Sequence, residues 1–268
     1  MATTIFTPQM LRNGTRAVPE IPAGSSFSNI YSFDFEGVDG WVNCGEIPPL
    51  FKYFPIGTAN SNPWSASMWV KGTGTNKGFF EIPYKQVNAL NARSFAFVLG
   101  ASGLYFGGKF ADIKIRESGT TAYNSSGWNH IVMTFDGVDY TALSSYTLYV
   151  GGVSIGIELI PANIGDFRTE NISIGVAGSD GGSTYYWDGQ IDEVSLFDSE
   201  LSSANVSSIY NGGVPNDLTS LSPLAWYRMG DDATWDGSNW TLTNQGSSGG
   251  TATSVNLTES DRVEDVPS

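Results

Sequence analysis

The chain has 268 residues, of which 40% are hydrophobic and 13% aromatic, enough for one large hydrophobic core. Its 27 acidic and 13 basic residues give a formal net charge of -14, which disfavours binding to the phosphate backbone of nucleic acids. A single cysteine, Cys44, and a single histidine, His130, exclude an internal disulfide, a cysteine-based metal cluster and zinc sites built from several imidazoles.

The first 30 residues are predicted to form an extended arm. Pro8, Pro19 and Pro22 lie there among small polar residues, and proline removes backbone donors and disfavours a helix. We expect this arm, residues 1–30, to pack on another chain or to be mobile in the isolated protein. The sequence has neither the apolar core of a signal peptide nor the roughly 20 apolar residues that cross a bilayer. We therefore expect no membrane insertion and no signal-peptide export.

Strand-like alternation of apolar and polar residues begins at residue 31, where Tyr31, Phe33 and Phe35 share one face. It recurs at residues 64–70, 79–84, 95–99, 113–116, 128–135, 146–150, 171–176 and 191–197. Short alternating strands separated by turn residues predict an all-β fold, a two-sheet antiparallel jelly-roll sandwich. The predicted core contains Phe33, Phe35, Trp64, Met68, Ile131, Phe135, Leu148, Ile172 and Ile191.

One short helix is predicted near residues 202–210. Ser202 supplies the side-chain oxygen that an N-cap needs, and apolar residues follow at 206, 209 and 210 with helical spacing. Asn211-Gly212-Gly213 then ends the helix. After it, residues 214–268 are rich in Ser, Thr, Asn and Gly, with strand-like segments at 224–229 and 254–258. We expect this C-terminal extension to pack on the sandwich beside its N-terminal strands.

Several blocks of the sequence carry a family resemblance. They are YSFDFEGVDGWVNCG (31–45), WSASMWVKG (64–72), WNHIVMTFDG (128–137), LYVGG (148–152) and GQIDEVSLFDSELSSANVSSIYNGG (189–213). Together they resemble the laminin-G-like, concanavalin A-like jelly-roll domains, over residues 31–213. The remaining tail is similar to the ending of laminin-G-like proteins of marine tailed phages. The resemblance implies a fold that is shared by glycan-binding modules, adhesion domains, pentraxin-like lectins and some glycoside-cleaving enzymes.

Catalysis is not expected from the acidic residues. Retaining glycosidases of this fold carry Glu-x-Asp-x-x-Glu on one strand, and the sequence contains no such run. Asp192 and Glu193 are adjacent on a predicted strand, so we expect their side chains on opposite faces. His130 lacks a nucleophile in a Gly-x-Ser-x-Gly elbow, and we expect it to be a packed strand residue.

The resemblance also implies a calcium ion near the rim of the sandwich, since related jelly rolls often hold one there. Asp136, Asp139 and Asp192 are the candidate ligands for a structural Ca²⁺. The alternative for each is a turn or a hydrogen bond to the backbone. Glycan binding requires exposed aromatic rings and polar loops, and the candidates are Tyr185, Tyr186, Asp180, Trp235 and Trp240. The alternative for these aromatic residues is packing, and Trp187 is expected in the core.

The leading functional hypothesis is a non-enzymatic phage virion surface protein, either a capsid decoration protein or a tail or fibre component, that binds host or environmental glycans. It predicts contacts with virion proteins through the arm, a homo-oligomer, and a location on the virion surface, outside the cell after lysis. The alternative is a carbohydrate-binding or adhesion module of a bacterial surface protein. A glycoside-cleaving enzyme is the third hypothesis.

Overall fold

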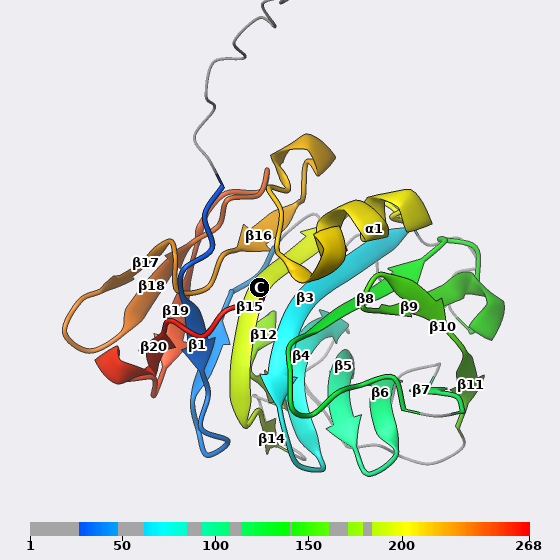
Figure 1. The fold of residues 1–268 in the computed structure, drawn as a ribbon, viewed down its shortest axis with the longest axis horizontal. Coiled ribbons are helices and arrows are strands. Elements are labelled where there is room, and N and C mark those ends of the chain that lie inside the picture. Colours follow the sequence, from blue (N-terminus) through cyan, green and yellow to red (C-terminus); the bar gives the residue numbers. More distant parts are fainter. Residues whose placement is uncertain are drawn as a thin grey trace, which may run out of the picture.

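Two antiparallel sheets pack face to face in the computed structural model (Figure 1). The structure describes residues 27–47, 62–84, 93–107, 114–119, 121–139, 141–160, 171–178 and 184–268. The predicted jelly-roll sandwich is confirmed. Within the described residues no helix is long and apolar enough to cross a membrane.

Sheet A contains eight strands in the described part of the chain. In spatial order they are β10 (Val153–Ile155), β9 (Tyr146–Val150), β8 (Asn129–Phe135), β3 (Trp64–Gly72), β15 (Gly189–Phe197), β1 (Ser32–Asp34) and β20 (Arg262–Val263), with β16 (Ala225–Tyr227) paired to β15. The long alternating segments form the centre of sheet A, because every second side chain of such a segment packs against the facing sheet. The first and last described strands, β1 and β20, lie side by side.

Sheet B contains ten strands in the described ranges. They are β11 (Ile157–Leu159), β7 (Ile115–Glu117), β6 (Gly103–Gly107), β5 (Arg93–Gly100), β4 (Lys77–Tyr84), β12 (Ser173–Ile174), β2 (Trp41–Asn43), β19 (Thr251–Val255), β18 (Trp240–Thr243) and β17 (Ala233–Trp235). A separate ribbon pairs β13 (Val176–Ala177) with β14 (Tyr185–Tyr186). Residues 214–268 thus supply strands to both sheets.

The core between the sheets contains every residue that the alternation predicts for it. All nine are at most 2% exposed: Phe33, Phe35, Trp64, Met68, Ile131, Phe135, Leu148, Ile172 and Ile191. Aromatic rings dominate this core and meet edge to face, as Phe97 and Phe106 do at 5.1 Å and 86°. The predicted burial is confirmed.

The predicted helix is confirmed as α1 (Ser203–Tyr210), the one α-helix within the described residues. The Ser202 hydroxyl accepts a hydrogen bond from the Asn205 backbone N–H at 3.2 Å, which caps the first turn. Asn211 ends the helix in the left-handed conformation, with φ +45°. Single-turn 3-10 helices occur at Leu143–Ser145, Asn211–Gly213, Thr219–Leu221 and Glu259–Asp261.

Two predicted strands differ from those observed. The segment 171–176 is split, because Gly175 has φ +84° and separates β12 from the β13–β14 ribbon. A Cβ on Gly175 would lie 2.3 Å from the Phe35 ring, so the glycine also allows a close approach to the core. The segment predicted at 254–258 lies at 251–255 instead. Its buried residues there are small, and Asn256 ends it with φ +56°.

Most of the predicted arm lies outside the described residues. Its last four residues, 27–30, are described, and they pack on the outer face of sheet A of the same chain. Packing on another chain or mobility was expected for the whole segment 1–30; residues 27–30 contact their own chain, and packing of the arm on another chain stays a prediction. Intrachain hydrogen bonds and ring contacts hold these four residues in place.

Candidate functional site

The outer face of sheet A is covered by its own chain. Helix α1 and the segment that follows it bury Val132, Phe197 and Trp226 in a second apolar cluster. The Tyr210 ring of α1 stacks on the Trp69 ring of β3, with 5.8 Å between the ring centroids. This covering leaves no open sheet surface for a ligand at these residues.

His130 is buried beneath this cover, and its Nε2 lies 2.9 Å from the Ser67 hydroxyl. Burial lowers the pKa of His130 to about 3, so its ring is neutral at pH 7. Its ring lies 4.8 Å from that of Trp69, between the strand and the helix. The prediction of a packed strand histidine is confirmed.

The sequence-based expectation for Asp192 and Glu193 is wrong. Their side chains do not point to opposite faces, because a β-bulge places two residues, Glu193 and Val194, opposite the single Met68 of β3. Glu193 takes φ +48° there, and Val194 returns to the core. The two adjacent carboxylates therefore share the outer side of β15.

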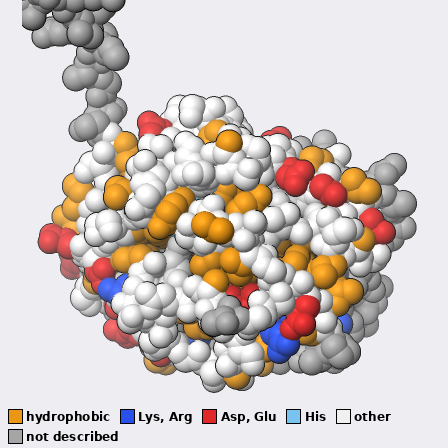
Figure 2. Space-filling model, turned by 45° about the vertical axis from the view of Figure 1, so that its right-hand side comes forward, with side chains coloured by type: hydrophobic (Ala, Val, Ile, Leu, Met, Phe, Trp, Pro, Cys, Tyr) orange, Lys and Arg blue, Asp and Glu red, His pale blue; other side chains and the backbone are white. Residues whose placement is uncertain are grey.

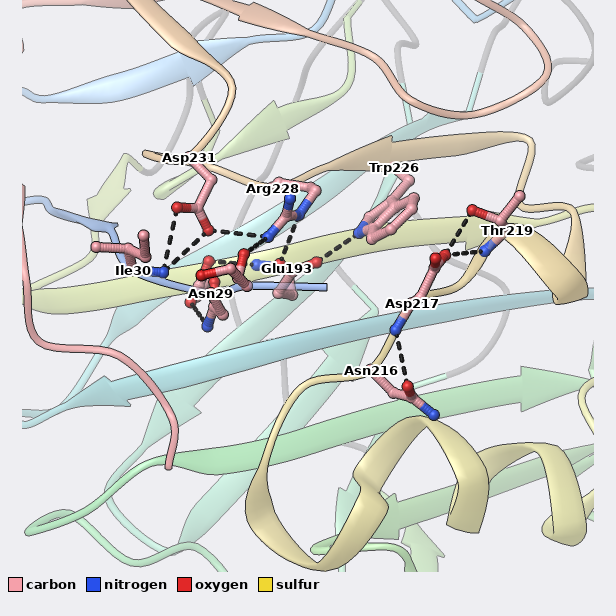
Figure 3. Close-up of polar contacts among 11 residues, drawn as sticks. Asn29, Ile30, Glu193, Asn216, Asp217, Thr219, Trp226, Arg228 and Asp231 are labelled. Carbon is pink, nitrogen blue, oxygen red and sulfur yellow. Dashed lines mark hydrogen bonds and ion pairs between the residues drawn. The ribbon is translucent and has the colours of Figure 1, made fainter. Parts of the chain in front are cut away.

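A buried polar cluster forms around the bulge (Figure 3). The Glu193 carboxylate accepts hydrogen bonds from Trp226 Nε1 at 2.5 Å and from Arg228 Nε at 3.1 Å. Arg228 also donates to Asp231 Oδ2 at 3.0 Å. Burial raises the pKa of Glu193 to about 7, although the charge of Arg228 acts in the opposite direction. Burial and the charge of Glu193 raise the pKa of Asp192 well above its ordinary value.

Residues 27–30, which we call the N-terminal clasp, cover this cluster. The Phe27 ring stacks on the Trp226 ring at 6.2 Å and lies 4.4 Å from the Arg228 guanidinium carbon. The Ser28 carbonyl accepts a hydrogen bond from Arg228. Ring stacking on Trp226 and a cation–π contact with Arg228 thus hold the start of the clasp.

The end of the clasp binds two carboxylates directly. Asn29 Nδ2 donates to Asp192 Oδ2 at 2.8 Å, and the Ile30 backbone N–H donates to Asp231 Oδ1 at 3.1 Å. Perturbed pKa values often mark functional sites. Here, however, the acids are covered by the clasp and hydrogen-bonded within the chain, so a sugar has no access to them.

The three predicted calcium ligands do not meet. Asp136 accepts from the Val138 backbone N–H at 2.8 Å, and Asp139 accepts from Thr141 N at 2.9 Å, both as turn hydrogen bonds. Asp192 lies in β15 under the clasp. Across the described ranges no three His, Cys, Asp or Glu side chains are placed to hold one metal ion. These donors therefore do not fit a shared calcium site.

Binding of a structural calcium ion stays a prediction. Melting the protein with EDTA and again after adding calcium chloride tests it. A lower melting temperature that calcium restores would support a structural ion, because a ligand that binds only the folded state stabilises it.

The outer face of sheet B carries a different arrangement. Gly78, Val98, Tyr105, Arg116 and Glu158 stand directly opposite one another on β4, β5, β6, β7 and β11. We call these five residues the cross-strand row. Side chains at these positions point away from the core, because the residues on either side of Val98 in β5 pack between the two sheets.

Two tyrosines lie on this face. The half-buried rings of Tyr105 and Tyr185 pack over small buried side chains, namely Ala96, Val98 and Ala177. Small residues beneath the rings hold them close to the sheet, with part of each ring exposed. Aromatic rings fixed in this way are surfaces on which the C–H face of a sugar can stack.

An ion pair stands beside the Tyr105 ring. Arg116 Nε donates to Glu158 Oε1 at 3.0 Å, and a second guanidinium nitrogen contacts the same oxygen. The Arg116 guanidinium carbon lies 5.9 Å from the centroid of the Tyr105 ring. The hydrogen bonds to Glu158 raise the pKa of Arg116. The side chains are 33% and 44% exposed, so both charged groups reach solvent.

The face continues as a polar surface across the other half of sheet B. Asn43, Thr253, Thr241 and Thr234 are opposite one another on β2, β19, β18 and β17.

Figure 2 shows another side of the molecule, the one on which β10 and β11 lie. Hydrophobic side chains gather in the middle of this side, acidic ones are scattered around them, and basic ones are sparse.

The other predicted aromatic ligands of a glycan, Tyr186, Trp235 and Trp240, do not join the outer face of sheet B. Tyr186 follows in β14 with its side chain on the other side of that strand. Trp240 is buried and packs 5.4 Å from the Phe33 ring, so its predicted role as an exposed stacking surface is wrong. Trp235 is half-buried on the core side, 5.3 Å from Trp240. Asp180 lies outside the described residues.

Sequence reasoning missed Tyr105, Arg116 and Glu158. The available signal was weak, namely polar and aromatic side chains at the outward positions of short strands. Their alignment depends on the pairing of strands that are distant in the sequence, such as β7 with β11. A single sequence does not contain that register.

Comparisons with known proteins agree with this architecture. The family model Laminin_G_3, described as the concanavalin A-like lectin/glucanases superfamily, matches residues 52–207. The chain is similar to a Bacteroides ovatus protein whose name proposes carbohydrate binding, with 13% identity and a TM-score of 0.58. That match covers 90% of this chain and 62% of the other, less than two thirds of its length.

Two further solved structures show similarity. The CBM40 module of a Ruminococcus gnavus IT-sialidase, bound to α2,3-sialyllactose, is 15% identical with a TM-score of 0.47, over 69% of this chain and 100% of that one. A SAP-like pentraxin of Limulus polyphemus is 12% identical with a TM-score of 0.43, over 68% and 82%. A comparison with curated protein sequences found no match.

Proposed function

We propose that this chain, which belongs to the concanavalin A-like lectin/glucanases superfamily, binds carbohydrate on the outer face of sheet B without cleaving it. One observation carries the proposal: the outer face of sheet A is covered by α1 and the clasp, whereas that of sheet B presents Tyr105 and Tyr185, with an exposed ion pair beside Tyr105. Rigid rings beside paired polar groups suit a sugar ring.

The absence of cleavage is supported by the placement of the acids. Glycoside hydrolysis needs two carboxylates on either side of the scissile bond, with space for the sugar between them. Asp192 and Glu193 share a face, but the clasp lies over them and their oxygens accept hydrogen bonds from Asn29 and Trp226. On the cross-strand row, the Glu158 carboxylate is paired with Arg116.

Glycan-array binding of the purified protein tests this function. We expect Tyr105→Ala and Tyr185→Ala each to weaken binding about fivefold, because each removes a stacking surface worth about 1 kcal/mol. Tyr210→Ala is the matched control, since it removes a half-buried tyrosine from the opposite side of the sandwich. Binding that is no weaker in both sheet B variants than in the wild type, or release of reducing sugar by the wild-type protein, would overturn the proposal.

We further propose that the domain is displayed on the surface of a phage particle and assembles as a homo-oligomer. The support is the resemblance of the C-terminal residues to the endings of phage proteins, and residues 214–268 are integral to both sheets. Mass spectrometry of purified particles tests the location. A protein found only in the bacterial envelope fraction would favour the alternative of a bacterial adhesion module.

A further inference from the structure

The charges on the cross-strand row point to the class of sugar that this face accepts. Arg116 and Glu158 are direct cross-strand partners and contact each other through two guanidinium nitrogens. Opposite charges at directly opposed positions stabilise each other in this orientation. The guanidinium thus carries its own counter-ion, and the pair is locally neutral.

A neutral pair of this kind still offers directional hydrogen bonds. A guanidinium has five N–H donors and a carboxylate has two accepting oxygens, more than the pair consumes internally. Both side chains are partly exposed, at 33% and 44%. Adjacent hydroxyl groups of a sugar each donate and accept, so one hydroxyl can accept from Arg116 while its neighbour donates to Glu158.

A sugar that carries a carboxylate is disfavoured at the same pair. Its anion would have to displace or lie beside Glu158, and the chain as a whole has a net charge of -14. Like charges placed together across a binding surface reject the wrong partner. The same face would therefore disfavour sialic and uronic acids.

We propose that the Arg116–Glu158 pair selects neutral sugars with free adjacent hydroxyl groups, and that Glu158 excludes acidic ones. This inference rests on the proposed carbohydrate binding at the outer face of sheet B. Tyr105 supplies the stacking surface, and the ion pair supplies the hydrogen bonds beside it. Glu158 acts here as a specificity residue.

The test uses an array that holds neutral oligosaccharides beside counterparts capped with sialic or uronic acid. The wild type is expected to bind only the neutral members. Glu158→Gln frees the Arg116 charge, and we expect a gain of about threefold to tenfold for acidic members, lost again at high salt. Arg116→Gln should weaken binding to the neutral members. Glu264→Gln, the same charge change at an exposed site outside the row, is the control.

The outcomes separate the two proposals. Wild-type preference for acidic members, or no gain for Glu158→Gln relative to Glu264→Gln, would overturn the neutral-sugar inference while leaving carbohydrate binding intact. No binding to any member by the wild type would instead overturn the proposed function itself.

Discussion

Asn29 donates a hydrogen bond of 2.8 Å to the Asp192 carboxylate, across 163 positions of sequence. The contact joins the N-terminal clasp to the central strand of sheet A, at a carboxylate that is completely buried. Burying a charged group is costly unless it is paired. The clasp is therefore part of what makes the bulged acid pair tolerable in the fold.

We expect the acid pair to make stability depend on pH. The folded-state pKa values of Asp192 and Glu193 lie above their unfolded values. Their contribution to the free energy of unfolding is therefore fully present below about pH 4. It is lost as the pH rises toward and through 7. Asp192→Asn should raise the melting temperature at pH 8 and change it little at pH 4.5. The Asn29 Oδ1 atom has no hydrogen-bond partner, so its amide can turn to accept from the new side chain.

Thermal melts of Asp192→Asn and the wild type across this range provide the measurement. Asp198→Asn removes the same charge at the exposed end of the strand and serves as the control. A stabilisation at pH 8 that equals the one at pH 4.5 would show that ionisation of Asp192 is not its cause.

Truncation should distinguish the clasp from the residues before it. Removing residues 1–26 keeps every described contact of the clasp, and we expect an unchanged melting temperature. Removing residues 1–30 takes away one donor from Asp192 and one from Asp231, at about 1–3 kcal/mol for a buried group that loses a partner. At about 2–4 °C per kcal/mol for a chain of this size, the loss is measurable by calorimetry. Equal melting temperatures for the two truncations would contradict the contribution of the clasp.

Gly175→Ala should be strongly destabilising. The residue has φ +84°, and its new Cβ would lie 2.3 Å from the Phe35 ring. Gly212→Ala is the control, because it has φ +70° and nothing within 4 Å of its Cβ position. We expect the control to lose about 1 kcal/mol from backbone strain, and Gly175→Ala about 1–3 kcal/mol more from the clash. Urea unfolding measures both, and similar losses would show that the Phe35 contact adds nothing.

Two buried tryptophans offer a matched comparison of hydrogen bonds. Trp226 Nε1 donates to the Glu193 carboxylate at 2.5 Å, whereas Trp240 Nε1 donates to the Thr258 carbonyl at 2.8 Å. Trp226→Phe should cost more at pH 8 than at pH 5, because only the ionised carboxylate forms the stronger, charge-assisted bond. Trp240→Phe should cost the same at both pH values. A pH-independent loss for Trp226→Phe would contradict ionisation of Glu193 in this range.

The features that the sequence predicts correctly are local ones. Alternation with period two identifies the buried side of each long strand, such as Met68 in β3 and Ile131 in β8, without knowledge of the partner strand. The helix follows from Ser202 and Asn211 in the same way, because its capping groups are a few residues apart. These patterns need no tertiary information.

The features that it misses depend on backbone geometry and register. The bulge at Glu193 requires a left-handed conformation in a residue that rarely adopts it, so local propensity gives no signal. Trp240 and Tyr105 are both aromatic strand residues, yet pairing buries the first and leaves the second half-exposed. Ligand-facing and core-facing aromatic residues become distinguishable only once the sheets are assembled.

The pairing of β1 with β20 also bears on how the chain is made. The Ser32 hydroxyl donates a hydrogen bond of 2.6 Å to the carbonyl of Asp265, which lies 233 positions further along the chain. During synthesis, this N-terminal strand leaves the ribosome long before either of its neighbours, β15 and β20, exists. Closing so long a loop is slow, and sheet A is completed only after β20 has emerged. Folding on the ribosome can therefore build the middle of the sandwich first, and its edge at β1 and β20 last.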